Sequence, residues 1–265
     1  MNQITHVVKH LLVINILMFV VTELIFPSWK GSLAMYYPGS EQFHPIQIVT
    51  HFFMHSGLMH LFFNMYALAM FGPPIEMLYR SKRFLFYYIV CALGAAVLHN
   101  LYTWYDVSQL QTAMEVFQAA PSYDHYWQFF NQINPKHFTL YGNEMVEKIS
   151  RQLLDGDTGQ TGAALQLMDE LVVRKMSIPA VGASGAIYGL LLAFGMQFPN
   201  HQLMLIFLPV PIKAKYFIPL LMAAEFYFGL QGFEWDPIAH FAHLGGAIAG
   251  FIMIMYWRKT GARLY

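Results

Sequence analysis

The sequence predicts an all-α membrane protein, a bundle of six transmembrane helices with a helical insertion between helices three and four. Three observations predict this class. Of the 265 residues, 57% are hydrophobic and only 11% are charged, whereas soluble domains average about 25% charged residues. Six apolar stretches approach the roughly 20 residues that a helix needs to cross a bilayer. One long segment between them is polar.

The predicted spans are Lys9–Pro27, Leu58–Leu78, Phe84–Thr103, Val181–Pro199, Ala214–Gln231 and Pro237–Trp257. The first is a retained span, because no small-residue cleavage site follows its apolar core, Leu11–Val21. The fourth starts close to Pro179, which disfavours helix just before it. The fifth follows an apolar piece, Leu203–Leu208, so its start is less sharply defined.

Basic residues near the span ends predict the orientation. They gather after the second span, between the fourth and fifth, and after the sixth (Arg80, Lys82, Arg83, Lys213, Lys215, Arg258, Lys259 and Arg263). With six spans, all three groups fall on one side, which the positive-inside rule makes cytoplasmic. We therefore expect an integral multi-pass protein of a bacterial cytoplasmic membrane, with both termini in the cytoplasm.

The segment Tyr105–Ile178 is polar and should lie outside the cytoplasm, because long segments are translocated largely regardless of charge. Apolar residues at helical spacing in Ala163–Val173 predict an amphipathic helix within it. The predicted domains are the first three spans (1–104), the extracytoplasmic insertion (105–178), and the last three spans with a short cytoplasmic tail (179–265).

Charge and cysteine content exclude two further features. Fifteen Lys and Arg residues balance fifteen Asp and Glu residues, so no basic footprint for nucleic acid exists. The single Cys91 excludes a disulfide within one chain.

Two short motifs place a serine and a histidine in apolar stretches: Gly182-Ala183-Ser184-Gly185 and Ala242-His243-Leu244-Gly245-Gly246. Polar groups in a membrane are costly and need a partner or a function. Each span also carries two glycines four residues apart, the spacing of a close-packing face (Gly185 and Gly189; Gly246 and Gly250). We therefore expect the two helices to meet and His243 to reach Ser184.

A serine hydrogen-bonded to a histidine can attack a carbonyl, because the imidazole removes the hydroxyl proton. Ser184 also stands at a predicted helix N-terminus, whose free N–H groups suit an oxyanion. The alternative role for Ser184 is an ordinary N-cap. Tyr188 lies on the same helix face and is predicted to stack on the His243 ring. No carboxylate is evident near either motif, so the prediction is a Ser–His dyad.

The second span offers candidate oxyanion donors. His60 and Asn64 are four residues apart and project from one face. Both can donate hydrogen bonds to a tetrahedral oxyanion. The alternative is that they form hydrogen bonds between helices, a frequent role of polar residues in membranes.

Together these residues resemble the rhomboid intramembrane serine proteases, over roughly residues 5–102 and 179–258. Three motifs carry the resemblance, in the right order and on the right spans: His60–Asn64, Gly182–Gly185 with Tyr188, and Ala242–Gly246. The stretch from Phe43-His44-Pro45 to Thr50, together with Gly72 and Glu76, is similar to the family pattern as well. The segment 105–178 departs from it, being much longer than the usual connection.

The resemblance implies a rhomboid-like bundle that cleaves membrane-spanning proteins near their extracytoplasmic end. Ser184 would be the nucleophile and His243 the general base, with His60, Asn64 and the Ser184 backbone N–H holding the oxyanion. Tyr188 and Gly182 would support the site. The family uses water and no metal or other cofactor, and its partners are transmembrane protein substrates and the lipid bilayer. Substrate would arrive beside the fifth span, under the loop Gly232–Asp236.

Five other residues have alternative roles. His240 is a rival base, but no glycine pair follows it, so we assign it a supporting role. His51 and His55 have a metal-ligand spacing without an evident third ligand, so no metal is predicted. Glu225 is an intramembrane acid that we expect near a wet cavity or bonded to a neighbouring helix. Glu76 is expected to tie down a loop or an adjoining helix.

Two other functions compete with proteolysis. A catalytically silent rhomboid-like factor would bind membrane proteins without cutting them, and loss of the serine or histidine would signal it. Both residues are present. A transporter using the histidines and Glu225 as a proton relay should have paired repeats or broken helices in both halves, and the sequence has no such symmetry.

Overall fold

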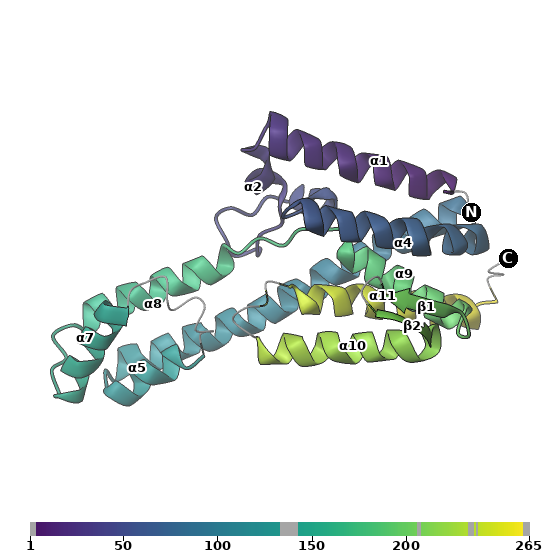
Figure 1. Cartoon of the computed structure of the whole chain (residues 1–265). Helices are drawn as coiled ribbons and strands as arrows, with labels where there is room; N and C mark the ends of the chain where they lie inside the picture. Colours follow the sequence, from purple (N-terminus) through teal and green to yellow (C-terminus); the bar gives the residue numbers. More distant parts are fainter. Residues whose placement is uncertain (1–3, 133–142, 206–207, 233–235, 237, 262–265) are drawn as a thin grey trace.

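Helices occupy all six positions where spans are predicted (Figure 1). The computed structural model describes residues 4–132, 143–205, 208–232, 236 and 238–261. The six helical segments are α1 (His6–Val20) with the turn η1 (Val21–Ile25), the two halves of α4 (Leu58–Ala119), α9 (Ser184–Gln197), α10 (Ala214–Gln231) and α11 (His240–Lys259). Pro237 and Arg263, used above for the sixth span and its basic group, lie outside the described residues.

Three of these helices are long and apolar enough to cross a bilayer: His6–Ile25, Leu58–Ala119 and His240–Lys259. The helix α9 is apolar but shorter. Within the described residues, the chain is therefore a mostly helical membrane protein, and the count of six spans stays a prediction.

The predicted second and third spans are two halves of one element, α4, broken at Arg80. The backbone there has φ 63° and ψ 155°, a positive φ that is uncommon for a residue other than glycine. The break falls between the predicted spans. The second half then continues as helix to Ala119, well beyond Thr103, where the third span was expected to end. This helix leaves the bundle and runs into the insertion (Figure 1).

A lobe formed by α5 (Tyr123–Phe130), α7 (Asn143–Leu154), α8 (Thr161–Met176) and the end of α4 projects from the bundle (Figure 1). It has a hydrophobic core of its own, which includes Val107, Leu110, Phe117, Tyr126, Phe129, Ile149, Met168 and Leu171. The predicted amphipathic helix Ala163–Val173 is confirmed within α8. Residues 133–142 of the predicted insertion lie outside the described residues.

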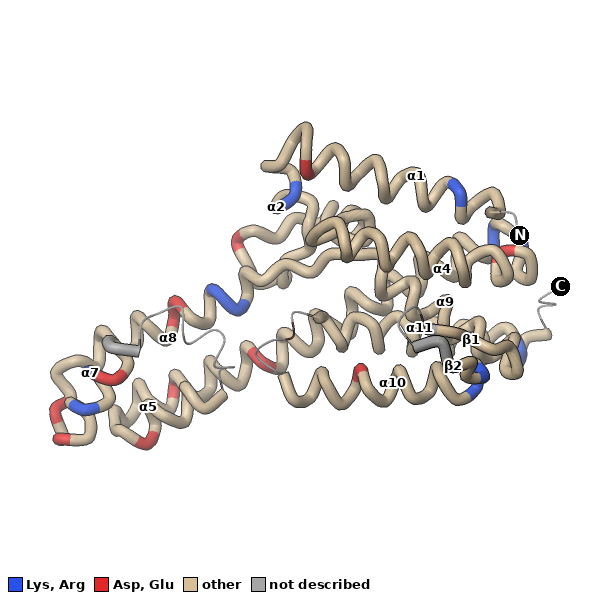
Figure 2. Tube along the Cα trace, in the orientation of Figure 1, with Lys and Arg blue, Asp and Glu red and all other residues tan. Residues whose placement is uncertain are grey.

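Charge is distributed unevenly between the bundle and the lobe. Figure 2 shows Lys and Arg near the end of the bundle where α1 begins and α11 ends, and a concentration of Asp and Glu in the lobe. At the base of the lobe, Lys175 pairs with Asp106 at 2.7 Å. The orientation of the two ends across a membrane stays a prediction.

The helices α4, α9 and α11 pack against one another at the centre of the bundle. A Cβ atom added to Gly246 would overlap the backbone carbonyl of Gly185, and one added to Gly185 would overlap the side chain of Ala95. The hydroxyl of Tyr87 donates to the carbonyl of Gly189 at 2.8 Å. The predicted close approach of α9 and α11 is therefore confirmed, and it depends on glycine at the crossing.

Short elements fill two connections. The helices α2 (Trp29–Leu33) and α3 (Gln47–Thr50) and the turn η2 (His51–Phe53) precede α4. Before α10, the strands β1 (Gln202–Leu205) and β2 (Leu208–Lys213) form an antiparallel pair, in place of the loosely defined apolar piece of the sequence. The N–H of Ala214 donates to the carbonyl of His201 at 2.8 Å, so the end of this pair fixes where α10 begins.

The carboxylate of Glu76 holds the first turn of α1. It accepts the N–H groups of Val7 and Val8, each at 3.0 Å, the hydroxyl of Ser81 at 2.6 Å, and the hydroxyl of Thr5. The Glu76 side chain is buried. N–H groups at a helix start lack partners within the helix, so this acid ties α1 to α4, as expected from the sequence.

Replacing Glu76 by alanine should lower the free energy of unfolding by about 1–3 kcal/mol, because it leaves buried N–H groups without acceptors. Thermal unfolding of the purified protein in detergent measures the effect. The neighbouring Met77, which is exposed, gives the matched control Met77→Ala. Equal melting temperatures for the two variants would show that the hydrogen bonds of Glu76 do not stabilise the fold by this amount.

Candidate active site

The segment before α9 is held by backbone hydrogen bonds that fix the position of Ser184. Met35 and Ala180 exchange hydrogen bonds at 3.0 and 2.7 Å, and the N–H of Gly182 donates to the carbonyl of His51 at 2.9 Å. Ser184 is the first residue of α9, and the cap position before it is Ala183. The N-cap alternative for Ser184 is therefore wrong, and its hydroxyl is free to make another contact.

Gly182 leaves the space that this site needs. Its φ of +124° is a conformation that residues with a side chain rarely adopt. A Cβ added there would stand 3.0 Å from Nε2 of His60 and 3.5 Å from Oγ of Ser184. Glycine therefore lets the His60 ring and the Ser184 hydroxyl face the same small volume.

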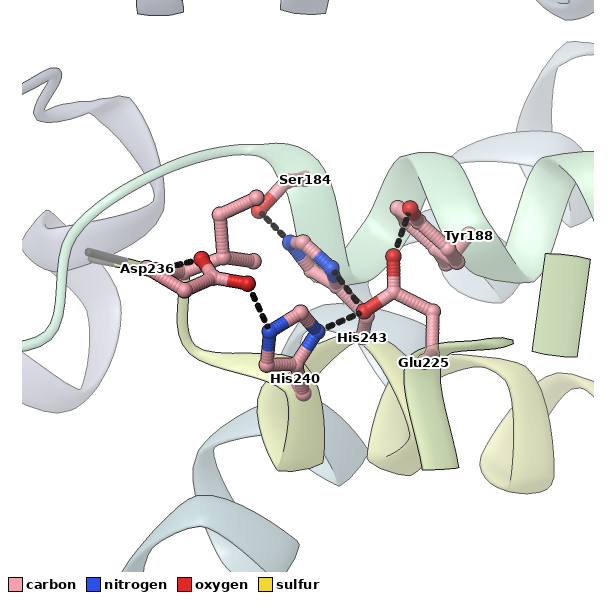
Figure 3. Close-up of polar contacts among 7 residues, drawn as sticks. Ser184, Tyr188, Glu225, Asp236, His240 and His243 are labelled. Atoms are coloured by element: carbon pink, nitrogen blue, oxygen red, sulfur yellow. Dashed lines mark hydrogen bonds and ion pairs between the residues drawn. The ribbon is translucent and has the colours of Figure 1, made fainter. Parts of the chain in front are cut away.

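The structure brings Ser184 and His243 together. Oγ of Ser184 lies 2.9 Å from Nε2 of His243 (Figure 3). The ring of Tyr188 stacks on the His243 ring, with centroids 4.1 Å apart and planes 8° from parallel. This stacking fixes the imidazole plane so that Nε2 faces the serine.

His60 and Asn64 differ in their hydrogen-bond partners. The N–H of Ser56 donates to Nδ1 of His60 at 3.2 Å, so we assign the ring proton to Nε2, the nitrogen that borders the space at Gly182. The side-chain amide of Asn64 donates to the backbone carbonyl of His60 at 2.7 Å. His60 therefore has a donor at the space it shares with Ser184, whereas one hydrogen of the Asn64 amide is used within its own helix.

A carboxylate lies behind His243, so the expectation that none is near the two motifs is wrong. Oε2 of Glu225, from α10, lies 2.9 Å from Nδ1 of His243 (Figure 3). A carboxylate accepts hydrogen bonds and cannot donate when ionised. Nδ1 of His243 therefore carries the proton, and Nε2 is left to accept the hydroxyl proton of Ser184. The expected dyad is extended by a third side chain.

The network continues beyond Glu225. Nδ1 of His240 lies 2.7 Å from Oε2 of Glu225, and Nε2 of His240 lies 2.9 Å from Oδ2 of Asp236. The hydroxyl of Tyr188 donates to Oε1 of Glu225. His240 is thus a supporting residue, as expected, and does not contact Ser184. Residues 233–235 of the loop Gly232–Asp236 lie outside the described residues.

The sequence held one signal for Glu225, because an acid within an apolar span is a functional candidate by default. The sequence does not show how α10 is rotated about its own axis. This rotation decides whether Glu225 faces lipid, a cavity or His243. His240 and His243 are three residues apart and share a helix face. One carboxylate from the next helix can therefore reach both rings.

Among the described residues, Glu225, His240 and His243 have ligand-type atoms within 4.8 Å of one another. The predicted pair His51 and His55 is not in such a group within that part of the chain. The ring Nδ1 of His51 instead lies 2.7 Å from the carbonyl of Gln47.

A cavity beside Ser184 is lined mostly by small side chains. Its polar side chains, apart from Ser184, are those of His51 and His99. The small residues include Ala92, Ala95, Ala96, Ala180, Gly185 and Ala242. These alanines and glycines leave space next to Ser184, which a reacting group and water would need.

Comparison with known proteins agrees with the motifs. A family model described as the Rhomboid domain matches residues 42–113 and 158–260. The mitochondrial protein named Rhomboid protein 1, from Saccharomyces cerevisiae, is 32% identical over 82 residues, which are 31% of this chain and 23% of the yeast protein. Between the two matched segments, the described residues of 114–157 fall in the lobe, and all the side chains of the network above fall in matched segments.

Proposed function

The chain belongs to the rhomboid family, and from that premise we propose that it is an intramembrane serine endopeptidase that cleaves transmembrane proteins. The observation that carries the proposal is the 2.9 Å contact between Oγ of Ser184 and Nε2 of His243. The hydrogen bond from Nδ1 of His243 to Glu225 gives the imidazole the tautomer that a general base needs.

The reaction follows from this geometry. As Oγ of Ser184 bonds to the scissile carbonyl carbon, its proton moves to Nε2 of His243. In this mechanism Nε2–H of His60 and the backbone N–H of Ser184 donate to the oxyanion and stabilise it. His243 then returns the proton to the leaving amine nitrogen as the C–N bond breaks. In the second step Nε2 of His243 takes a proton from water as the water oxygen bonds to the ester carbon. When the bond from that carbon to Oγ breaks, His243 gives this proton to Oγ and Ser184 is restored.

Asn64 has a weaker claim to the oxyanion role than His60. Its amide already donates one hydrogen to the backbone of α4, so it would use the second. Tyr188 and Gly182 support the pair, the first by stacking on the base and the second by leaving space. The site needs no metal or cofactor for this reaction.

A catalytically silent member of the family is the second candidate function. Such a protein would bind transmembrane partners without cutting them. This function does not require a hydrogen bond between the serine and the histidine. The 2.9 Å contact between Ser184 and His243, together with the hydrogen bond from His243 to Glu225 that orients the imidazole, favours the protease.

For the arrangement in the membrane, we propose six spans, with the end of the bundle rich in Lys and Arg facing the cytoplasm. Both termini are then cytoplasmic, in a bacterial cytoplasmic membrane. We propose domain boundaries at 104/105 and 178/179, with the lobe, which has a hydrophobic core of its own, outside the cytoplasm. Ser184, which follows the lobe directly in the chain, faces that side.

Reconstitution in liposomes tests the function. The purified protein is mixed with single-span substrates, and the product masses locate the cut. The matched control is the same extramembrane sequence without its transmembrane segment. We expect cleavage of the membrane-spanning form only, near its extracytoplasmic end. Stable binding of these substrates with no product would instead identify the silent factor.

A further inference from the structure

We propose that Glu225 is a positioning residue that completes a Ser184–His243–Glu225 triad, and that His240 and Asp236 hold its carboxylate in the charged form. This inference rests on the proposed protease function and deepens it. It assigns a role to three side chains that a serine–histidine dyad does not require.

The Glu225 carboxylate is surrounded by donors. Oε2 faces Nδ1 of His243 at 2.9 Å and Nδ1 of His240 at 2.7 Å, and Oε1 accepts the hydroxyl of Tyr188 (Figure 3). The Glu225 side chain is only 8% exposed. An acid buried among acceptors or apolar groups would take up a proton, but three converging donors stabilise the ionised form.

His240 supplies the positive charge that a buried anion needs. Both of its ring nitrogens lie within hydrogen-bond distance of a carboxylate oxygen, one on Glu225 and one on Asp236. In the proposed network both carboxylates are ionised and only accept, so each ring nitrogen of His240 donates a proton to one of them and the ring carries the positive charge. The Asp236 side chain is 7% exposed, so this pairing is shielded from water on both sides of the ring.

The charges in this cluster suit the transition state. At rest, Asp236 and Glu225 carry two negative charges and His240 one positive charge, so the cluster has a net charge of minus one. When His243 accepts the Ser184 proton, its new positive charge makes the total zero. Charge that develops beside a fixed opposite charge in a shielded site is strongly stabilised. Two further ionisable groups lie near His243: Tyr188, whose ring stacks on it, and His60, on α4.

A purely structural latch between α10 and α11 is the competing explanation. The same hydrogen bonds would then hold two helices together, and their loss would reduce stability without a specific effect on the chemical step. The two explanations separate in kinetics, because an interaction used mainly in the transition state lowers kcat and leaves KM nearly unchanged.

The test compares Glu225→Gln with Leu17→Met, a control on α1, away from the fifth span, where the side chain is exposed. Glutamine keeps the shape and removes the charge. We expect kcat of Glu225→Gln to fall by about 10²–10⁴-fold, as when the acid of a serine triad is neutralised, with KM changed by less than about threefold. Leu17→Met should match the wild type. A kcat of Glu225→Gln near the wild-type value, or a loss confined to KM or melting temperature, would overturn the proposal.

Asp236→Asn provides a second variant if Glu225→Gln does not fold. It removes the far charge of the network and leaves the contacts of Glu225 in place. A fall in kcat of about tenfold at unchanged KM supports the network, and an unchanged kcat overturns it. Assays with a metal chelator test whether Glu225, His240 and His243 share protons, as proposed, or bind a metal ion together. We expect no effect, and activity lost to the chelator and restored by Zn²⁺ would also overturn the proposal.

The wild type separates this inference from the proposed function. If the wild type neither cleaves membrane-spanning substrates nor reacts at Ser184 with a fluorophosphonate, the protease function itself fails. If the wild type does both and Glu225→Gln equals it in kcat, the protease function stands and the triad alone is rejected.

Discussion

Replacing Ser184 by alanine is expected to abolish cleavage of every transmembrane substrate while the protein stays folded and inserted. In the proposed reaction the hydroxyl is the group that bonds to the scissile carbon, so its loss would remove covalent catalysis altogether. In serine hydrolases such a change lowers kcat by about 10⁶-fold, below detection for an intramembrane protease assay. Product formation in liposomes, followed by mass spectrometry, measures the result.

Ser177→Ala is the matched control for this variant. The Ser177 hydroxyl donates to the carbonyl of Val173 at the end of α8 and has no place in the proposed reaction, so its loss should leave cleavage intact. His243→Ala should be as inactive as Ser184→Ala, and the double variant no worse than either, because residues that act as a unit are not additive. Cleavage by purified Ser184→Ala protein would contradict the assigned nucleophile.

Replacing Gly246 by alanine is expected to separate α9 from α11 and to inactivate the protein. The added Cβ would overlap the backbone carbonyl of Gly185, which cannot move aside as a flexible side chain can. Overpacking of this kind costs about 1–3 kcal/mol of stability. A shift of about 1 Å at the reacting groups can cost about 10²-fold in rate. Melting temperature and cleavage rate should therefore both fall.

Gly162→Ala is the matched control for Gly246→Ala. Gly162 lies in α8, and a Cβ added there meets no atom within 4 Å. Alanine also favours helix over glycine by roughly 1 kcal/mol, so this variant should be as stable as the wild type or slightly more stable. If Gly246→Ala retained wild-type activity and melting temperature, the close crossing of α9 and α11 would not be what holds Ser184 against His243.

The sequence predicted the central contact because its causes are local. Two glycines four residues apart on each of two apolar helices indicate where the backbones meet, and the structure has Gly185 and Gly246 at that crossing. Tyr188 follows Ser184 by one helical turn, so its place over the His243 ring could be expected from spacing alone.

Features that depend on how helices rotate and end could not be predicted in this way. Whether Glu225 faces lipid or His243 depends on the packing of α10 against α9 and α11. Because α10 carries apolar residues on all of its faces, its sequence alone does not show which face packs against them. The end of the third span was estimated from where the sequence turns polar. The helix instead continues to Ala119, because its own Phe117 packs against apolar residues of the lobe such as Tyr126.

Covalent labelling is the most direct test of the central claim that Ser184 is a nucleophile activated by His243. The purified wild-type protein is treated with a fluorophosphonate in membranes, digested, and mapped by mass spectrometry. The account predicts one adduct, on the peptide that contains Ser184, and none in the His243→Ala protein. An adduct on another residue, or equal labelling of Ser184 with and without the histidine, would contradict it.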